Sequence, residues 1–336
     1  MMDRPLVSVI IPCYNAERYV EQSIRSIMQQ TYTALEIIAI DDGSVDGTVL
    51  ILQRLAAEDQ RIRLVIHDEN KRLVFTLNEG LALARGRYIA RMDADDIAMP
   101  NRIAVQVDVL ECNPQIVVVG SFMRVIQAEQ LRGKWIAPID DLRIRSYLFI
   151  ASPFFHPTIM FRNGLPDLYY REDAYRAEDY DFWVRLLEHG KGYNIPRVLL
   201  HYRLLATSET KLGEQDAARR FAIFSDIHTR ILSVYGISLP HHWQRLYTAS
   251  TVKDWIPFIT SSSISELLRV YGYIEQGVKK VNAPLAGTVK GYLGLRLLAY
   301  LRYGRFTKRF QDFFEVLKSS YFYRGAITLI LRRVKL

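Results

Sequence analysis

Three aspartates, Asp93, Asp95 and Asp96, lie within four positions, shortly after the apolar residues Tyr88–Ala90. Like charges this close together repel one another, and aspartate is unfavourable inside a strand. An extended chain directs the side chains of Asp93 and Asp95 toward one face. Carboxylate oxygens suit Mg²⁺ or Mn²⁺, and these ions usually share their ligands with substrate phosphates. The cluster is therefore either an ordinary acidic turn or a site for a divalent cation.

Two more acidic residues, Asp41 and Asp42, begin the turn sequence Asp-Asp-Gly-Ser after the apolar run LEIIAI. A carboxylate at such a place can accept a hydrogen bond from the imide N–H of uracil or thymine, or from a ribose hydroxyl. The alternative is a turn whose residues suit the backbone geometry alone. The residue types by themselves leave both interpretations open.

A third acidic pair, Glu178-Asp179, opens the helix predicted in AEDYDFWVRLLEHG. Acidic residues are favoured in the first turn of a helix because they interact with the helix dipole, so the pair can be a structural cap. A carboxylate directed into a cleft can instead serve as a general base. The sequence alone does not choose between these two roles.

Several other kinds of site are excluded by missing motifs. The chain has no GxGxxG after its first predicted strand and no GxxxxGK[ST], which removes the main support for a dinucleotide dehydrogenase or a P-loop enzyme. It has no GxSxG nucleophile elbow. Its seven histidines form no HExxH, and its two cysteines, Cys13 and Cys112, are far apart in sequence, so we expect no zinc site.

The elements that must position these residues alternate between strand and helix. Continuous β-branched or apolar runs, typical of strands buried on both faces, are followed by apolar residues at helical spacing. The predicted strands are 6–11, 35–40, 62–66 and 87–92. This order predicts an α/β protein with a parallel, Rossmann-like sheet and right-handed crossovers. Ligands of such sheets bind beyond the carboxyl ends of the strands, which is where Pro12–Glu17, Asp41–Ser44 and Asp93–Asp96 lie.

The composition is that of a globular protein, because 49% of the 336 residues are hydrophobic and 24% are charged. The N-terminal sequence MMDRPLVSVIIPCYNAE lacks the layout of a signal peptide. No stretch reaches 18 uninterrupted apolar residues, so we expect no transmembrane helix. Two cysteines cannot form a disulfide framework and suit a reducing compartment.

The net charge of +8 is unevenly distributed along the chain. Residues 279–336 contain thirteen Lys or Arg and two acidic residues, a net charge of +11, whereas residues 1–278 carry −3. In this tail, basic residues alternate with aromatic and aliphatic ones, as in YLGLRLLAYLRYGRFTKRF and FYRGAITLILRRVKL, a pattern typical of amphipathic helices at a membrane surface. The alternative is a helical cap on the catalytic domain with snorkelling Arg side chains. No motif supports nucleic-acid binding, and we expect none.

Five motifs together resemble the family 2 glycosyltransferases with the GT-A fold. They are VSVIIPCYNAE, IDDGSVDGT, LNEGLALARGRYIARMDADDIAMPNR, FFHPTIMFR and AEDYDFWVRL, and the resemblance covers about residues 5–205. It implies a GT-A, Rossmann-like and mostly parallel sheet flanked by helices, followed by a helical C-terminal extension. It also implies a hexosyltransferase that moves a sugar from a nucleotide diphosphate donor, with inversion at the anomeric carbon.

The resemblance assigns a role to each candidate residue. Asp179 would be the catalytic base, Asp95 the principal metal ligand for Mn²⁺ or Mg²⁺, and Asp93 a contact to ribose or metal. On the acceptor side the candidates are His156, whose alternative is a packed histidine in a Pro-flanked loop, together with Glu178 and Asp96, the latter also supporting Asp95. The remaining residues would bind the nucleotide sugar, with Asp41 or Asp42 reading the pyrimidine: Pro12, Tyr14, Asn15, Glu17, Asp41, Asp42, Arg72, Asn78 and Ala94.

Two stretches depart from the family pattern. Many relatives have Asn-Lys-Gly where this chain has Asn70-Lys71-Arg72, so we expect the loop before the third helix to differ. Many also carry YRxH after the base helix, whereas Leu205 stands at the histidine position here. We therefore expect this protein to do without that histidine or to use His201.

The resulting hypothesis is a bacterial-type glycosyltransferase, cytoplasmic and peripheral to the membrane, that uses a UDP-sugar or similar donor. Its acceptor would be a glycan or lipid-linked hydroxyl in cell-surface polysaccharide synthesis. The expected domains are a catalytic domain over 1–210, with a nucleotide-binding half over about 1–100 and an acceptor half over about 101–210, and a basic helical region over 211–336. The alternatives are a GT-A-like nucleotidyltransferase and an inactive nucleotide-sugar-binding protein.

Overall fold

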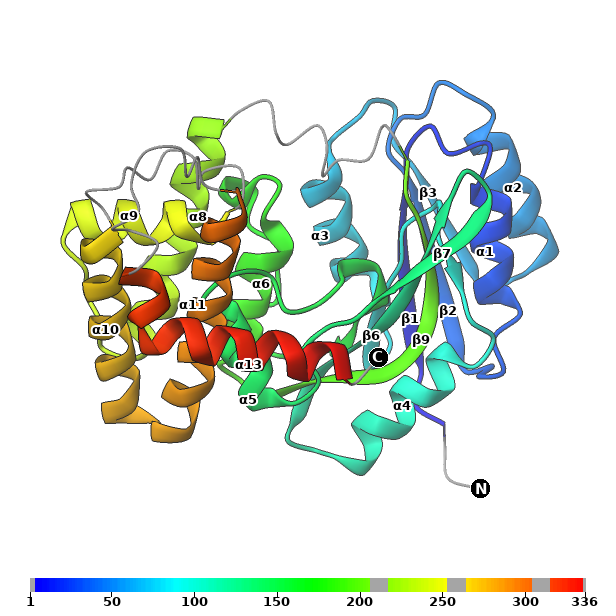
Figure 1. Cartoon of the computed structure of the whole chain (residues 1–336). Helices are drawn as coiled ribbons and strands as arrows, with labels where there is room; N and C mark the ends of the chain where they lie inside the picture. Colours follow the sequence, from blue (N-terminus) through cyan, green and yellow to red (C-terminus); the bar gives the residue numbers. More distant parts are fainter. Residues whose placement is uncertain (1–3, 206–216, 253–263, 304–314, 335–336) are drawn as a thin grey trace. The chain divides into compact units, whose positions relative to one another are not determined.

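The computed structural model describes residues 4–205, 217–252, 264–303 and 315–334 (Figure 1). The chain forms two compact units. The first contains Met1–Asp140 and Phe154–Glu214, and the second contains Asp141–Pro153 and Gln215–Leu336. The predicted division into 1–210 and 211–336 stays a prediction.

The first unit is built around one large sheet, which has nine strands in the described residues. The strands are β1 (Val7–Cys13), β2 (Leu35–Asp41), β3 (Ile62–Ile66), β4 (Tyr88–Arg91), β5 (Ile97–Ala98), β6 (Ile116–Gln127), β7 (Gln130–Trp135), β8 (Met160–Arg162) and β9 (Lys191–Arg203).

The order of the strands along the sheet is β3-β2-β1-β4-β8-β6-β9-β5, with β7 paired to β6. Strands β1 to β4 are parallel to one another, as predicted, and β1 carries β2 on one side and β4 on the other. Strand β8 then pairs antiparallel with both β4 and β6, which makes the sheet mixed. Strand β6 is twelve residues long because it continues into the hairpin with β7.

The helices of the first unit are α1 (Val20–Met28), α2 (Thr48–Glu58), α3 (Leu73–Leu83), α4 (Arg102–Cys112) and α6 (Glu178–Leu186), with short 3-10 turns at His156–Thr158 and Glu172–Ala174. Figure 1 shows α1 and α2 on one side of the blue strands and α3 on the other. The apolar residues of α1, α2 and α4 form one buried cluster with alternate residues of β1, such as Val9 and Ile11. Strands covered on both faces read as continuous apolar runs, which is why β1 and β2 were visible in the sequence.

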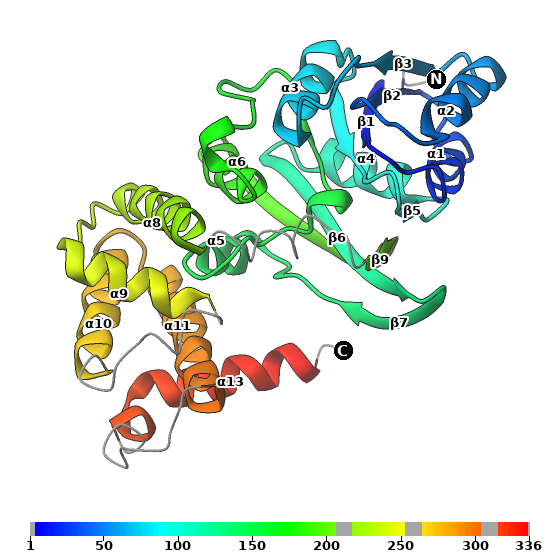
Figure 2. The same ribbon diagram turned by 90° about the horizontal axis from the view of Figure 1, so that it is seen from above.

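The second unit consists of helices. They are α5 (Asp141–Leu148), α8 (Ala217–Val234), α9 (His241–Thr251), α10 (Ile264–Val281), α11 (Ala283–Tyr303) and α13 (Ser320–Val334), shown from above in Figure 2. Segment 141–153 belongs here because its backbone accepts hydrogen bonds from Tyr247 (to the Phe149 carbonyl, 2.5 Å) and Arg296 (to the Ile150 carbonyl, 2.9 Å). Helices α11 and α13 approach closely at Gly294, where a Cβ would lie 2.0 Å from the Tyr321 carbonyl oxygen.

Among the described residues, none of the helices combines the length and the apolar character needed to cross a bilayer. The tail sequences singled out for membrane contact lie partly in α11 and α13 and partly, over 304–314 and 335–336, outside the described residues.

Candidate active site

The carboxyl ends of β1, β2 and β4 lie side by side at one edge of the sheet. Cys13, the last residue of β1, pairs with Asp41, the last residue of β2, and the Asp42 N–H donates to the Cys13 carbonyl at 2.8 Å. The Met92 N–H, just beyond β4, donates to the Ile10 carbonyl. This register brings together the three polar clusters that the sequence placed at strand ends.

The loop after β1 is fastened to the loop after β2 by side-chain hydrogen bonds. The Asn15 amide oxygen accepts from the Val45 N–H at 3.0 Å, and the Glu17 carboxylate accepts from the Gly47 N–H at 2.7 Å. Asn15 adopts a φ of 46°, a left-handed conformation in which asparagine is relatively well tolerated. Both side chains thus have a structural role in shaping this edge of the sheet.

The other two residues predicted on this loop differ in exposure. Pro12 lies inside β1 opposite Ile40, whereas the side chain of Tyr14 projects from the loop and the residue is 51% exposed. Tyr14 is therefore available to a ligand at the strand ends, and Pro12 is part of the sheet that supports it.

The acidic triad Asp93, Asp95 and Asp96 sits just beyond β4. One carboxylate oxygen from each lies within 4.8 Å of the other two. Burial, and then repulsion from Asp93, raises the pKa of Asp95 to about 7. Burial, and then repulsion from Asp93 and Asp95, raises the pKa of Asp96 well above its usual value. Ala94, between them, is buried.

The triad fits a divalent cation on three grounds. Its donor atoms are all carboxylate oxygens, which Mg²⁺ and Mn²⁺ prefer. Burial first, and then repulsion between the ionised carboxylates, raises the pKa of Asp95 and Asp96, and a dication would offset both effects. Finally, Oδ2 of Asp96 is buried and has no hydrogen-bond partner in the described part of the chain, which leaves it as a candidate ligand atom.

Buried arginines surround the triad. Arg91, the last residue of β4, forms an ion pair with Asp93. The two residues are two positions apart, so in an extended chain their side chains point to the same face. Arg102, on α4, is completely buried and donates to the Arg91 carbonyl at 2.7 Å. Sequence reasoning missed both residues, although the position of Arg91 two residues before Asp93 was a usable signal.

Arg203, the last residue of β9, connects the acidic loop, which is the segment 93–96 after β4, to two other segments. Its backbone N–H donates to Asp96 Oδ1 at 2.9 Å, and its Nε donates to the Asp95 carbonyl at 3.0 Å. Its two terminal nitrogens reach Glu129 at 2.7 Å and Gln22 at 2.9 Å. Glu129 lies in the tight turn between β6 and β7, so Arg203 connects this hairpin to the aspartates.

The loop before α3 contains Arg72, which is exposed and has φ 73° and ψ 157°. This backbone region is used almost only by glycine. The chain therefore places an arginine in a glycine-type conformation, at the position where many relatives were noted above to have glycine. Asn78, further along α3, uses its amide for two hydrogen bonds with the backbone of Tyr170, at 2.7 and 2.8 Å, so its side chain holds the 167–171 segment.

Beside these residues lies a histidine that sequence reasoning did not select. His67 follows β3 and contacts Asp42 with one ring nitrogen and Glu79, on α3, with the other. Asp42 therefore has a fixed partner. Asp41 differs, because its Oδ2 accepts from the Ser44 N–H while its Oδ1 is buried without a partner in the described residues.

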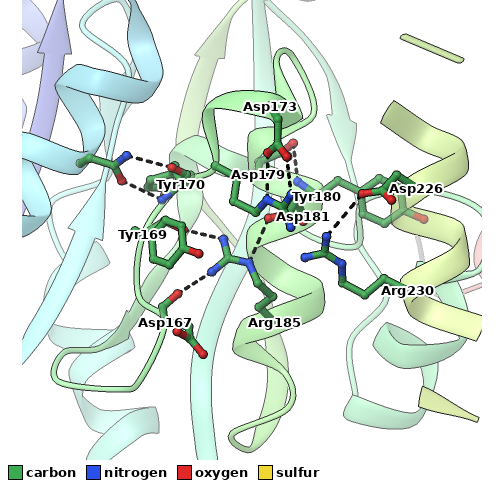
Figure 3. A network of polar contacts seen from close by, with 12 residues as sticks. Asp167, Tyr169, Tyr170, Asp173, Asp179, Tyr180, Asp181, Arg185, Asp226 and Arg230 are labelled. Carbon is green, nitrogen blue, oxygen red and sulfur yellow. Dashed lines mark hydrogen bonds and ion pairs between the residues drawn. The ribbon is translucent and has the colours of Figure 1, made fainter. Parts of the chain in front are cut away.

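Glu178 and Asp179 occupy the first turn of α6, as predicted (Figure 3). Asp179 Oδ1 accepts a hydrogen bond from the N–H of the adjacent Tyr180 at 2.7 Å, within the first turn of the helix, and no side chain caps the helix at its N-cap residue, Ala177. Asp181, in the same turn, is 2% exposed and forms an ion pair with Arg185, whose guanidinium also donates to the backbone of Asp167 and Tyr169. The 167–169 segment is thus anchored to α6.

His156 lies among aromatic residues. Its Nε2 is 2.9 Å from the Tyr170 hydroxyl, and its ring lies 5.7 Å from that of Trp183 in an edge arrangement. Burial, and then the charge of Arg91, lowers the pKa of His156 well below its usual value, so it is neutral at physiological pH. A neutral, aromatic-packed imidazole can position a neighbour or accept a proton weakly, and the packed-histidine interpretation fits these contacts.

Known proteins similar to this chain place it in a family. The model of "Glycosyl transferase family 2" matches residues 8–165. The putative teichuronic acid biosynthesis glycosyltransferase TuaG of Bacillus subtilis is 39% identical over 230 residues, which cover 67% of this chain and 89% of TuaG. The Escherichia coli enzyme WfgD, a UDP-Glc:alpha-D-GlcNAc-diphosphoundecaprenol beta-1,3-glucosyltransferase, is 28% identical over 67% of this chain and 87% of its own length.

Solved structures share the fold. The Staphylococcus aureus TarS 1–349 complex with UDP-GlcNAc aligns with a TM-score of 0.58 at 18% identity, covering 88% of this chain and 87% of the other. The mannosyltransferase PcManGT of Pyrobaculum calidifontis, solved with GDP-Man and Mn²⁺, aligns with a TM-score of 0.53 at 17% identity, covering 92% and 89%. This chain thus belongs to glycosyl transferase family 2 and is a glycosyltransferase with the GT-A fold.

Proposed function

We propose that the protein transfers a sugar, with inversion, from a nucleotide diphosphate donor to a hydroxyl of a glycan or lipid-linked acceptor in cell-surface polysaccharide synthesis. The observation that carries the proposal is the acidic triad, whose carboxylates lie within 4.8 Å of one another beside the ends of β1 and β2. The names of TuaG and WfgD support the polysaccharide role, and those of WfgD and the TarS complex support a UDP-sugar donor.

In this proposal the strand ends bind the donor. Asp41 or Asp42 accepts a hydrogen bond from the base, Tyr14 packs on the nucleoside, and Asp93 contacts the ribose or the metal. Asp95 and Asp96 would hold Mn²⁺ or Mg²⁺, in line with the PcManGT structure. When bound, the ion would act as a Lewis acid toward the departing diphosphate.

Asp179 is the proposed general base. Its carboxylate takes the proton of the acceptor hydroxyl while that oxygen forms a bond to the anomeric carbon from the side opposite the diphosphate. The bond between this carbon and the phosphate oxygen breaks, and its electron pair leaves with the nucleoside diphosphate. The nucleotide-binding part of this machinery lies in residues 1–100 and the acceptor part in residues 101–210.

The test is turnover of a panel of UDP-, GDP- and dTDP-sugars with Mn²⁺, followed by NMR of the product's anomeric configuration. Asp179→Asn should lower kcat at least about a hundredfold, because general-base catalysis contributes about 10²–10⁴. Its affinity for UDP should stay within about twofold. Glu188→Gln, an exposed acid after the same helix, is the matched control. Unchanged turnover of Asp179→Asn, or retention of anomeric configuration, would contradict the mechanism.

We also propose that the second unit binds the cytoplasmic face of an anionic membrane. On α13, the exposed apolar residues Tyr323 and Ile327 are four positions apart, and the exposed Arg324 lies beside them. At the end of α10, Lys279 and Lys280 are exposed and precede Val281, which is 62% exposed. Exposed apolar residues beside cations suit an interface of anionic headgroups and acyl chains.

Vesicle flotation tests this binding. The protein should float with vesicles that contain phosphatidylglycerol at low salt, and less at high salt or with phosphatidylcholine alone, because salt screens the attraction. The double variant Y323S/I327S should float less than the wild type, whereas Leu50→Ser, which changes an exposed leucine of the first unit, should not differ. Failure of the wild type to float on anionic vesicles would refute membrane binding.

A further inference from the structure

His67 joins a strand end to a helix through its two ring nitrogens. Its side chain is 3% exposed, with Nδ1 2.8 Å from Asp42 Oδ1 and Nε2 2.6 Å from Glu79 Oε2. Asp42 follows β2, and Glu79 lies on α3. Phe75, on the same helix, packs its ring against the imidazole at a centroid distance of 5.7 Å. The imidazole is therefore held on three sides.

These contacts fix the orientation of the Asp42 carboxylate. Oδ1 of Asp42 accepts both from His67 and from the Lys71 N–H, at 2.8 Å each. Its Oδ2 accepts no hydrogen bond from the residues that the structure describes. With Oδ1 occupied by two donors, Oδ2 is the oxygen that remains for a ligand at the end of β2.

When Asp42 and Glu79 are both ionised, both contacts can be hydrogen bonds only if each ring nitrogen carries a proton. A neutral imidazole can donate to only one of two carboxylates, whereas an imidazolium donates to both. Burial lowers the pKa of His67, the hydrogen bonds to Asp42 and Glu79 raise it, the nearby Lys71 lowers it, and the net direction is upward. The imidazolium, which donates a hydrogen bond to each of the two carboxylates, is therefore populated up to a higher pH than in an ordinary histidine.

We propose that His67 is a positioning residue for donor binding, which holds Asp42 so that its Oδ2 can accept a hydrogen bond from the base or ribose of the nucleotide. This rests on the proposed function, in which the end of β2 binds the nucleoside. As the pH rises and the imidazolium loses a proton, one of the two carboxylates loses its donor. In the neutral tautomer that keeps its proton on Nε2, the carboxylate without a donor is Asp42, and through this tautomer nucleotide affinity falls although His67 never touches the nucleotide.

Two substitutions separate the two hydrogen bonds. The amide nitrogen of His67→Asn takes the place of Nδ1 and keeps the donor to Asp42, whereas that of His67→Gln takes the place of Nε2 and keeps only the donor to Glu79. Calorimetry with UDP and Mn²⁺ between pH 6 and 8.5 should show H67N binding within about threefold of the wild type at pH 6, without the decline at higher pH. H67Q should bind about tenfold more weakly, the loss expected for one buried hydrogen bond.

Glu79→Gln provides an independent readout. It keeps a hydrogen-bonding partner for Nε2 but removes a charge that raises the His67 pKa, so the decline of UDP affinity should move to lower pH. The imidazole ¹⁵N signals of His67 in the free protein should titrate above the ordinary histidine value in the wild type and lower in E79Q. The exposed His189, changed to Asn, is the control and should alter neither measurement.

The outcomes distinguish the two proposals. A wild type that binds UDP, together with H67Q of the same affinity and pH profile, would overturn the positioning role and leave the proposed function standing. A wild type that binds none of UDP, GDP and dTDP would overturn both. If H67Q does not fold, the pH shifts of E79Q and H67N decide, since both keep a hydrogen bond to Asp42.

Discussion

Replacing Arg203 by methionine removes the link between the acidic loop and its neighbours while keeping most of the side-chain volume. Arg203 has only 4% of its side chain exposed and makes three side-chain hydrogen bonds, to the Asp95 carbonyl, Glu129 and Gln22. Its guanidinium also lies 4.3 Å from the centre of the Tyr19 ring. The backbone hydrogen bond from residue 203 to Asp96 survives the substitution.

The expected decrease in the free energy of unfolding on Arg203→Met follows from how exposed each partner of Arg203 is. Glu129 and Gln22 are exposed, so water replaces Arg203 there and each contact contributes about 0.5 kcal/mol or less. The Asp95 carbonyl loses a charge-assisted bond worth about 1 to 2 kcal/mol, and the lost packing on Tyr19 adds about 0.5 kcal/mol. The total is about 2 kcal/mol. For a unit of this size, that lowers the melting temperature by about 4 to 8 °C.

Thermal melting and hydrogen exchange measure this effect. Arg203→Met should melt lower than the wild type and exchange faster in peptides that contain residues 93–97. Arg203→Lys should lie between them, because a lysine retains one of the three contacts. Arg197→Met, an exposed position on the same strand, should change stability by less than about 0.5 kcal/mol. If Arg203→Met melts like Arg197→Met, Arg203 does not hold the acidic loop.

Two further predictions concern strain and pH. Arg72→Gly should raise the free energy of unfolding by about 1 kcal/mol. The glycine-type backbone conformation costs an arginine about 1 to 3 kcal/mol, and the greater conformational entropy of glycine in the unfolded chain removes part of the gain. Arg72→Ala should give no such gain, and urea titration of both variants measures the difference. The pKa of Asp95 is raised to about 7 in the folded protein, so its ionised form destabilises the fold above that pH and the penalty disappears as the pH falls. Mn²⁺ should therefore raise the melting temperature more at pH 8 than at pH 6; equal shifts at both pH values would contradict the assignment.

The parts of the fold that sequence reasoning predicted are those encoded by local patterns. The run at 35–40 reads as a strand because a strand buried on both faces is largely apolar. The run at 62–66 forms the partly exposed strand β3 at the end of the strand order, and its β-branched residues are what marked it as a strand. The antiparallel pairing of β8 beside β4 joins segments about seventy residues apart, and no local pattern encodes such a pairing. The hairpin of β6 and β7 is local, but its turn residues, Ala128 and Glu129, adopt φ values of 49° and 60° without the glycine or asparagine that usually marks such a turn.

The candidate site likewise contains residues that a local sequence pattern indicates and residues that it does not. The acidic triad and the Glu178-Asp179 pair are contiguous in sequence, so their spacing alone drew attention to them. The contacts of His67 with Asp42 and of Arg203 with Asp95 span 25 and 108 positions, and they depend on the sheet register that brings the strand ends together. A histidine or an arginine in a loop carries no mark of such a partner.

The charges around the triad imply that metal and donor bind as a pair. Arg91, Arg102 and Arg203 are all buried, and their charges offset those of the three aspartates when these are ionised; Glu129, which also pairs with Arg203, is 59% exposed, so water screens its charge and it is left out of the count. A dication alone would leave the buried site with two surplus positive charges, and a diphosphate alone would leave it with surplus negative charge. Bound together, the two ligands keep the site near neutrality, which is the condition that a desolvated cluster of charges requires. Electron paramagnetic resonance of Mn²⁺ should therefore show at least about tenfold tighter binding when UDP is present than when it is absent. Equal affinities would mean that the arginines do not set the charge balance of the site.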